Sequence, residues 1–292
     1  MNAPVIQLSS LVKRFGTRSV LDGLDWRVDA GQVIGLLGRN GSGKSTLLEC
    51  LLGILPVDGG TAQLFGAGVE TMTAAVRAQI GYVPQTANLF GWQTPRQMLA
   101  YFAALYPHWH HARVDSLLAR WGFTDAMLTG QIDKLSGGEK QKLSIIRALA
   151  PDPALLILDE PVAALDPVAR REFLRELVDD VIARGTTVVF STHILTDLER
   201  VAVDVAFLRD GQIALQGGLD SLLDGARRIS GPAALMAPLV VPGELRRTSD
   251  AAGFTQVVTH CASAALLAAV AQHGALRVDR LSLEDLFVEV TQ

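Results

Sequence analysis

The sequence predicts an α/β fold: a mostly parallel sheet covered by helices, with an antiparallel β portion, a helical insert and a small C-terminal α+β portion. Three observations lead to this fold class. An apolar strand, a glycine-rich turn and an apolar helix follow one another within residues 33–55. Apolar strands expected at 80–85, 155–160 and 186–192 alternate with helical stretches, as in parallel sheets. Residues 92–150 have a predominantly helical pattern.

Composition and charge disfavour several classes of protein. The chain has 292 residues, of which 49% are hydrophobic, so it can bury a substantial core. The formal net charge of -4 supplies no broad cationic field, and we therefore expect no nucleic-acid partner. No apolar stretch approaches the ~20 residues that a membrane-spanning helix requires. Cys50 and Cys261 lack a C-x-x-C partner, so neither a disulfide framework nor a zinc site is indicated.

Two antiparallel features flank the expected parallel strands. Residues 5–15 and 19–32 look like short alternating strands separated by turn residues. Residues 206–215 predict a hairpin, because the pair Asp210 and Gly211 suits a tight two-residue turn between apolar runs.

After about residue 225 the composition shifts to alanine, glycine and proline, and residues 231–243 suggest a linker or a loosely structured connection. Beyond it we expect a strand at 255–261, a helix at 263–274 closed by Gly274, and a last helix at 281–290. Ser282 opens that last helix, with Asp285 placed for a capping box. The expected domains are residues 1–224, with a helical subdomain at about 92–150, and residues 225–292.

A phosphate-binding loop is the strongest chemical signal. The sequence from Gly38 to Ser45 is G-x-x-x-x-G-K-S, placed between an expected strand and an expected helix. Its glycines let backbone N–H groups converge on phosphates, Lys44 reaches the terminal phosphates, and Ser45 can ligate Mg²⁺. The strand and helix flanks disfavour the alternative of a chance glycine-rich turn. The expected nucleotide-binding residues of the loop are Gly38, Arg39, Asn40, Gly41, Ser42, Gly43, Lys44, Ser45 and Thr46.

A second signal is the apolar strand 155–160, which ends in Asp159 and Glu160. Asp159 at the carboxyl end of a strand can hold Mg²⁺ through water, and Glu160 can polarise the water that attacks a γ-phosphate. Alone, two acids at a strand end are equally consistent with a solvated strand terminus. The phosphate loop upstream favours the catalytic interpretation.

Residues 135–139, LSGGE, resemble the signature sequence that defines ABC ATPases among phosphate-loop NTPases. The signature, LLILDE and then His193 follow one another in the order of that family, whereas SGG alone is also an ordinary helix-capping turn. The resemblance covers roughly the first three quarters of the chain. It implies an ABC ATPase core, ATP and Mg²⁺ as cofactors, and hydrolysis of ATP.

The resemblance assigns roles to residues outside the loop. Phe15 resembles the aromatic residue on which adenine stacks, a position where tyrosine is commoner. Gln85 resembles the glutamine that senses the γ-phosphate and Mg²⁺ and carries the signal to a membrane partner. His193 resembles the histidine that contacts the γ-phosphate. Together with Glu160 and Lys44, His193 is expected to be catalytic, and the expected metal ligands are Ser45, Gln85 and Asp159.

The resemblance also implies a dimer, because in that family ATP is held between the phosphate loop of one domain and the signature of another. Ser136, Gly137 and Gly138 would bind the γ-phosphate held by the other subunit. Asp166 resembles the loop that crosses to the opposite subunit, although Ala164 stands where serine is common. Each chain has one signature, so a homodimer or a heterodimer with a related chain must form.

Residues 106–109 and 281–290 are similar to bacterial ABC subunits of the drug-export and antibiotic-resistance type. This similarity implies export through a separate integral membrane subunit, with the chain peripheral on the cytoplasmic side of the cell membrane. The sequence names no substrate, and import stays open. The expected socket for a partner helix lies between Gln85 and the helical insert, and an ordinary helical core is the alternative. Its aromatic residues are Phe90, Trp92, Tyr101, Phe102, Tyr106 and Trp109.

Three other interpretations fit the sequence less well. A soluble ABC ATPase of DNA repair, translation or cluster assembly would usually carry coiled-coil or zinc insertions or a second ATPase half. A phosphate-loop kinase would leave LSGGE and His193 unexplained. A metal site at His108, His110 and His111 lacks nearby cysteines and an established helical pairing.

Overall fold

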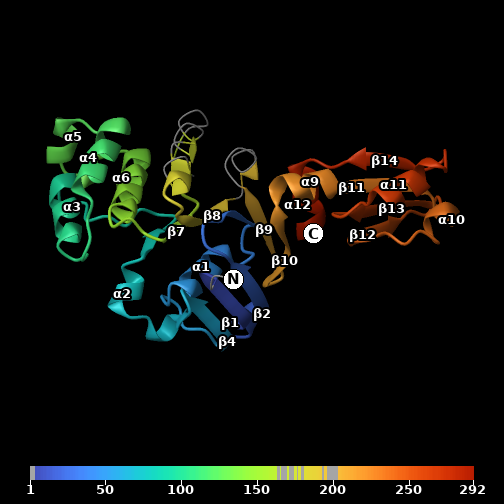
Figure 1. Cartoon of the computed structure of the whole chain (residues 1–292), viewed down its shortest axis with the longest axis horizontal. Coiled ribbons are helices and arrows are strands. Elements are labelled where there is room, and N and C mark those ends of the chain that lie inside the picture. The colour runs from blue at the N-terminus through green and yellow to red at the C-terminus, as the bar shows by residue number, and fades with distance from the viewer. Residues whose placement is uncertain are drawn as a thin grey trace.

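The computed structural model of the chain describes residues 4–162, 165, 170, 174–175, 177–178, 181–192, 194–195 and 203–292. His193 and Asp166, two of the expected site residues, and Ala164 lie outside the described residues. In the described part the molecule is elongated, with the helices from α3 (Pro95–Ala103) to α6 (Gly137–Leu149) at one end, a C-terminal sheet at the other and the central sheet between them (Figure 1).

An antiparallel sheet is built from the N-terminal residues, as predicted. Its strand order is β2-β1-β4-β5. A register shift between Leu8 and Leu11 of the first strand keeps both leucines buried although they are three residues apart. The strands are β1 (Ile6–Phe15), β2 (Arg18–Val28), β4 (Gly59–Leu64) and β5 (Ala67–Gly68).

The central sheet is mostly parallel, which confirms the expected fold class. Its strand order is β10-β9-β3-β8-β7-β6, and the β9/β10 pair is antiparallel. The inner strands β3, β7 and β8 are buried along their whole length, which explains their nearly continuous apolar sequences. The strands are β3 (Val33–Leu37), β6 (Ile80–Val83), β7 (Leu155–Asp159), β8 (Thr187–Thr192), β9 (Asp204–Arg209) and β10 (Gln212–Gly218).

The hairpin between β9 and β10 has the predicted two-residue turn. Asp210 has φ 49° and Gly211 has φ 74°. Positive φ at both central residues is typical of a type I′ turn, whose twist matches that of the flanking strands.

The first helix differs from its predicted range of 47–55. It begins at Lys44 and ends at Leu51. The chain turns at Gly53, which has φ +65°, and an added Cβ there would lie 2.9 Å from the carbonyl oxygen of Val69. The left-handed conformation of Gly53 ends the helix before residue 55, and the close approach of Val69 leaves no room for a side chain there.

The region from residue 95 to residue 149 is predominantly helical, as the pattern predicted. The capping boxes of Thr94 with Gln97 and of Ser136 with Glu139 fix two of their starts. Among the described residues, no helix combines the length and apolar character that a membrane span needs. The helices up to this point are α1 (Lys44–Leu51), α2 (Ala74–Arg77), α3 (Pro95–Ala103), α4 (His111–Arg120), α5 (Asp125–Thr129) and α6 (Gly137–Leu149), with short 3₁₀ segments at Val69–Thr71 and Ile132–Lys134.

The C-terminal residues form a third, antiparallel sheet with strand order β12-β13-β11-β14. The expected boundary between residues 224 and 225 falls at the end of α9, and the domain division stays a prediction. The elements are α9 (Leu219–Gly225), β11 (Arg227–Pro232), α10 (Ala233–Met236), β12 (Glu244–Ser249), β13 (Phe254–Thr259), α11 (Ala264–Ala271), β14 (Arg277–Arg280) and α12 (Leu283–Thr291).

Two C-terminal predictions were wrong. Residues 231–243 are not a loose linker, because they end β11, form α10 and bury Met236 and Val241 in a small apolar core. Gly274 does not close α11, which ends at Ala271 with a right-handed cap at Gln272. The capping box at the start of the last helix, formed by Ser282 and Asp285, is confirmed.

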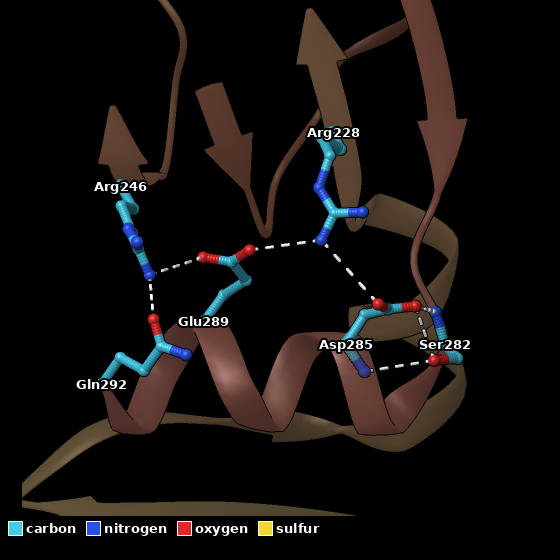
Figure 2. A network of polar contacts seen from close by, with 6 residues as sticks. All are labelled: Arg228, Arg246, Ser282, Asp285, Glu289 and Gln292. Atoms are coloured by element: carbon cyan, nitrogen blue, oxygen red, sulfur yellow. Dashed lines mark hydrogen bonds and ion pairs between the residues drawn. The ribbon is translucent and has the colours of Figure 1, made fainter. Parts of the chain in front are cut away.

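Helix α12 joins the third sheet to the rest of the molecule. Its apolar residues, among them Leu286 and Val290, belong to the same buried core as the central sheet. Its polar side faces the third sheet, where Glu289 accepts from Arg228 of β11 at 3.2 Å and lies 3.4 Å from the Arg246 guanidinium of β12 (Figure 2). The Glu289 side chain is only 13% exposed, so this carboxylate links both strands to α12.

We predict that Glu289→Gln lowers the free energy of unfolding by about 1 to 3 kcal/mol, because two arginines lose a mostly buried charged partner. The effect should stay below that of a fully buried pair, since both arginines keep contact with water. Chemical denaturation measures it. The control is Asp279→Asn, which breaks the exposed pair with Arg277 and should cost less than about 1 kcal/mol. An equal loss in both variants would contradict the bridging role.

Candidate functional site

The predicted phosphate loop connects β3 to α1. Gly43 caps α1 in the left-handed conformation, with φ 102° and ψ 12°, and no side chain caps the helix. The first N–H groups of α1 therefore lack side-chain acceptors and carry the positive end of the helix dipole. Lys44, Ser45 and Thr46 form the first turn of the helix. This arrangement is suited to an anion with several oxygens.

Glycine is required at both ends of the loop. A Cβ at Gly38 would lie within 2.4 Å of the Ser42 Oγ and 2.8 Å from the carbonyl oxygen of Leu208. A Cβ at Gly43 would lie 2.9 Å from Cγ1 of Val20, and its φ of +102° is itself a strained value for other residues. The Ser42 Oγ is buried and has no hydrogen-bond partner among the described residues. The loop is thus tightly folded, and the Ser42 hydroxyl is available to a bound ligand.

Lys44 links the loop to the two predicted acids. Its side chain is buried, and its Nζ donates to the carbonyl oxygens of Gly38 at 2.8 Å and Arg39 at 3.3 Å. Burial lowers the pKa of Lys44, while the nearby carboxylates of Glu160 and Asp159 act in the opposite direction. The ammonium group therefore lies in the electric field of both acids at the end of β7.

The two acids occupy different environments. Asp159 is the last residue of β7 and is 3% exposed, whereas Glu160 is partly exposed and has φ 45°, a left-handed value. The Nε2 of Gln85 donates to Oε2 of Glu160 at 3.3 Å. The structure thus brings together Lys44, Gln85, Asp159 and Glu160, four of the residues expected in the site.

Ser191 is a site residue that the sequence did not single out. Its Oγ donates to Oδ1 of Asp159 at 2.5 Å and accepts from the backbone N–H of Glu160 at 2.9 Å. Ser191 and Asp159 are partners in the parallel register of β7 and β8. The sequence could have indicated this contact only by position, since Asp159 and Ser191 both lie near the carboxyl ends of apolar strands.

The signature turn is not part of this cluster. Ser136 caps α6, and its Oγ accepts from the N–H of Glu139 at 3.3 Å. None of the described hydrogen bonds of Ser136, Gly137 or Gly138 reaches the phosphate loop. Figure 1 shows α6 grouped with α3 to α5, away from α1. The signature of the same chain therefore does not complete the pocket around its own phosphate loop.

Phe15 also lies apart from the acids. It ends β1, is 50% exposed, and has the Nζ of Lys13 5.4 Å from its ring centroid. An exposed ring is free to stack on a planar ligand, but the described contacts do not place it against the phosphate loop.

A cavity of about 600 Å³ lies beside the phosphate loop. Residues Arg39 to Ser42 form one wall, and Thr291 and Gln292 from the end of α12 contribute another. The Nη1 of Arg209 donates to the carbonyl oxygen of Val290 at 3.0 Å and fixes the end of α12 there. No pattern in the sequence indicated that the last helix ends next to the phosphate loop.

The residues present fit ATP and Mg²⁺. The Ser45 hydroxyl, the Asp159 carboxylate and the Gln85 amide supply hard oxygen atoms, which are the ligands that Mg²⁺ prefers. Among the described residues, no group of three His, Cys, Asp or Glu could hold a metal ion. In nucleotide-hydrolysing sites Mg²⁺ is usually bound by one or two carboxylates together with waters and substrate phosphates.

Comparison with known proteins identifies the family. The sequence profile of the ABC transporter family matches residues 21–163, and an AAA domain profile matches residues 131–196. Nod factor export ATP-binding protein I of Burkholderia lata is 36% identical over 222 residues, which are 75% of this chain and 72% of that protein. The chain belongs to the ABC transporter family. It is an ATP-binding, ATP-hydrolysing member, and ATP and Mg²⁺ are its cofactors.

Solved structures of ABC proteins share the fold. The structure of an ATP binding subunit of an ABC transporter has 29% identity and a TM-score of 0.68, over 75% of this chain and 92% of that one. A bacterial Atm1-family ABC exporter with ATP bound has 27% identity and a TM-score of 0.66 over 77% of this chain, but only 40% of the exporter is covered. This ABC protein thus corresponds to one part of that exporter.

We predict that Lys44→Ala weakens ATP binding by about 10- to 100-fold, because a hydrogen bond from a charged donor to phosphate contributes about 1.5–3 kcal/mol. Titration with a fluorescent ATP analogue measures the dissociation constant. Lys134→Ala is the control, since Lys134 is exposed in a 3₁₀ segment and should leave binding unchanged. Unchanged affinity in Lys44→Ala would contradict the role assigned to this lysine.

Proposed function

We propose that this chain is the ATP-hydrolysing subunit of an ABC exporter, paired with a second ATPase subunit and bound to a separate integral membrane subunit. It would lie at the cytoplasmic side of the cell membrane. The observation that carries the proposal is the separation of the two halves of the nucleotide site within one chain. Two of the similar proteins support export, since they are a Nod factor export ATP-binding protein and an Atm1-family exporter.

Pairing of two subunits follows from this separation. The N-terminus of α6 presents N–H groups at Gly137 and Gly138, while the capping box occupies the N–H of Glu139. A 13-residue helix also carries its full dipole to that end. A γ-phosphate held by the loop of a second subunit would satisfy these donors, so ATP would join the two subunits and its hydrolysis would release them.

Each clustered residue has a proposed chemical role. Lys44 binds the terminal phosphates, and Ser45 and Asp159 hold Mg²⁺, which neutralises phosphate charge when bound. Glu160 orients and polarises the attacking water. Gln85, hydrogen-bonded to Glu160, reports the state of the site to the membrane subunit. The γ-phosphate contact of His193 and the cross-subunit contact of Asp166 remain proposals from the sequence resemblance.

An exposed aromatic cluster supports docking of a membrane subunit. Phe90 lies between three other rings, with centroid distances of 6.4 Å to Trp92, 5.8 Å to Tyr101 and 6.2 Å to Phe102. Trp92 is 71% exposed, and Phe90 and Tyr101 are also exposed. Three exposed aromatic rings are suitable anchors for an amphipathic helix of a partner. Tyr106 and Trp109 form a separate ring pair.

Side-chain contacts connect this cluster to the hydrolysis site. The guanidinium of Arg147 on α6 lies 4.9 Å from the Phe102 ring centroid and donates to the carbonyl oxygen of Tyr82 at 3.3 Å. Gln141, also on α6, donates to the carbonyl oxygen of Pro84 at 3.4 Å. Both contacts end on the segment that leads into Gln85. Movement of the aromatic cluster can therefore reach Glu160 through α6 and this segment.

We predict that Glu160→Gln keeps ATP binding, lowers the ATP turnover rate by at least about 100-fold, and accumulates an ATP-dependent dimer. The amide preserves shape but cannot take part as a base. Phosphate release gives the rate, and size-exclusion chromatography with and without ATP gives the dimer. Glu70→Gln, at an exposed acid in the 3₁₀ segment Val69–Thr71, should behave like the wild type. Undiminished turnover in Glu160→Gln would refute the catalytic assignment.

For the membrane partner, we predict that Trp92→Ala reduces recovery of an integral membrane protein with the tagged chain from detergent-solubilised membranes. Basal ATP hydrolysis by the purified chain should remain, since Trp92 lies outside the catalytic cluster. Val240→Ala is a matched control, because Val240 is 86% exposed in the C-terminal portion. Recovery of ribosomes or nucleic acid without a membrane protein would instead favour a soluble ABC ATPase.

A further inference from the structure

We propose that Ser191 is a positioning residue of the hydrolysis site, whose single hydroxyl holds the Asp159 carboxylate and the Glu160 backbone in their working geometry. The inference rests on the proposed roles of these two acids. It adds a residue that the sequence did not single out, and it predicts that the Mg²⁺ dependence of hydrolysis is sensitive to a side chain of strand β8.

The hydroxyl of Ser191 makes one hydrogen bond to each of the two acidic residues. Ser191 is 0% exposed, so water does not compete for its oxygen. A serine hydroxyl has one hydrogen to donate, and here that hydrogen goes to Oδ1 of Asp159 at 2.5 Å. The oxygen accepts the N–H of Glu160 at 2.9 Å. The Ser191 Oγ thus contacts two consecutive residues, Asp159 and Glu160, at the end of the neighbouring strand β7.

The first contact fixes the orientation of the Asp159 carboxylate. With Oδ1 engaged by Ser191, the group cannot rotate about its χ2 axis without losing a charge-assisted hydrogen bond. Its other oxygen then keeps one direction and is the atom left for a magnesium-bound water. Removal of a residue that hydrogen-bonds to a metal ligand commonly lowers metal affinity or activity by about 10- to 100-fold.

The second contact stabilises an unusual backbone conformation. Glu160 has φ 45°, and a left-handed conformation costs a residue other than glycine about 1 kcal/mol or more. The hydrogen bond from its N–H to Ser191 offsets part of this cost. The turn directly after β7 places Glu160 where its carboxylate meets Gln85 at 3.3 Å. Loss of the serine hydroxyl removes this restraint on Glu160.

The register explains why Ser191 performs both tasks. Asp159 and Ser191 are opposite partners in the parallel β7/β8 pairing, and Ser191 also pairs with Leu36 of β3, next to the start of the phosphate loop. Ser191 therefore lies between the strand that carries the loop and the strand that carries the acids. No side chain at another β8 position has this placement in the register.

The test compares the Mg²⁺ dependence of ATP hydrolysis by the purified full chain and its variants. For Ser191→Ala we expect the Mg²⁺ concentration at half-maximal rate to rise about 10-fold or more and kcat to fall about 10- to 100-fold. Binding of ATP in EDTA should stay within about twofold of the wild type, because the Lys44 contacts do not involve Ser191. A merely structural role would not shift the Mg²⁺ midpoint.

Ser144→Ala is the matched control. Ser144 is also 0% exposed, and its hydroxyl has no hydrogen-bond partner among the described residues. It should leave the Mg²⁺ midpoint and kcat unchanged. An unchanged midpoint in Ser191→Ala, or the same shift in Ser144→Ala, overturns the proposal.

Two further variants keep the proposal testable if Ser191→Ala does not fold. Ser191→Thr retains a hydroxyl, and Ser191→Cys replaces it with a weak donor of similar size. We expect the threonine variant to have the lower Mg²⁺ midpoint, and the reverse order contradicts the proposal. If Glu160→Gln traps an ATP-dependent dimer but Ser191→Ala has the wild-type Mg²⁺ midpoint, the role of Ser191 is wrong and the proposed function stands. Full turnover in Glu160→Gln removes the proposed function beneath it.

Discussion

The parallel pairing of β3, β8 and β7 is the constraint on which the site depends. Parallel strands end at the same edge of a sheet, so the phosphate loop after Leu37, the hydroxyl of Ser191 and the carboxylate of Asp159 meet there. All three strands are buried along their length. A one-residue slip of β8 against β7 would turn Ser191 to the opposite face and break the contact with Asp159.

The helical portion is connected to the same sheet by hydrogen bonds from α6 to the segment at the end of β6. Helix α6 begins with the signature turn and contacts the carbonyl oxygens of Tyr82 and Pro84 further along. These two hydrogen bonds connect the helix that carries the signature turn to the segment that leads into Gln85. In the proposed dimer this couples a γ-phosphate on one subunit to the aromatic docking cluster of the other.

The C-terminal portion is packed against the catalytic core. Helix α12 places apolar side chains in the central core, presents Glu289 to two arginines of the third sheet, and ends against Arg209. Its last residues line the cavity beside Arg39 to Ser42. The phosphate loop is thus in contact with a cavity whose shape depends on the position of the C-terminal helix.

Local features were determined by the sequence alone. The phosphate loop, the turn at Asp210 and Gly211 and the capping box at Ser282 each depend on residues within about a turn of one another, so spacing and residue type suffice. Only the tertiary structure decided the partnership of Ser191 with Asp159 and the burial of Met236 in what looked like a linker. The first depends on the register of β7 against β8, and the second on the packing of α10 against β11 and β13. The arginines of β11, β12 and β14 interrupt the apolar alternation that would have indicated these strands in the sequence.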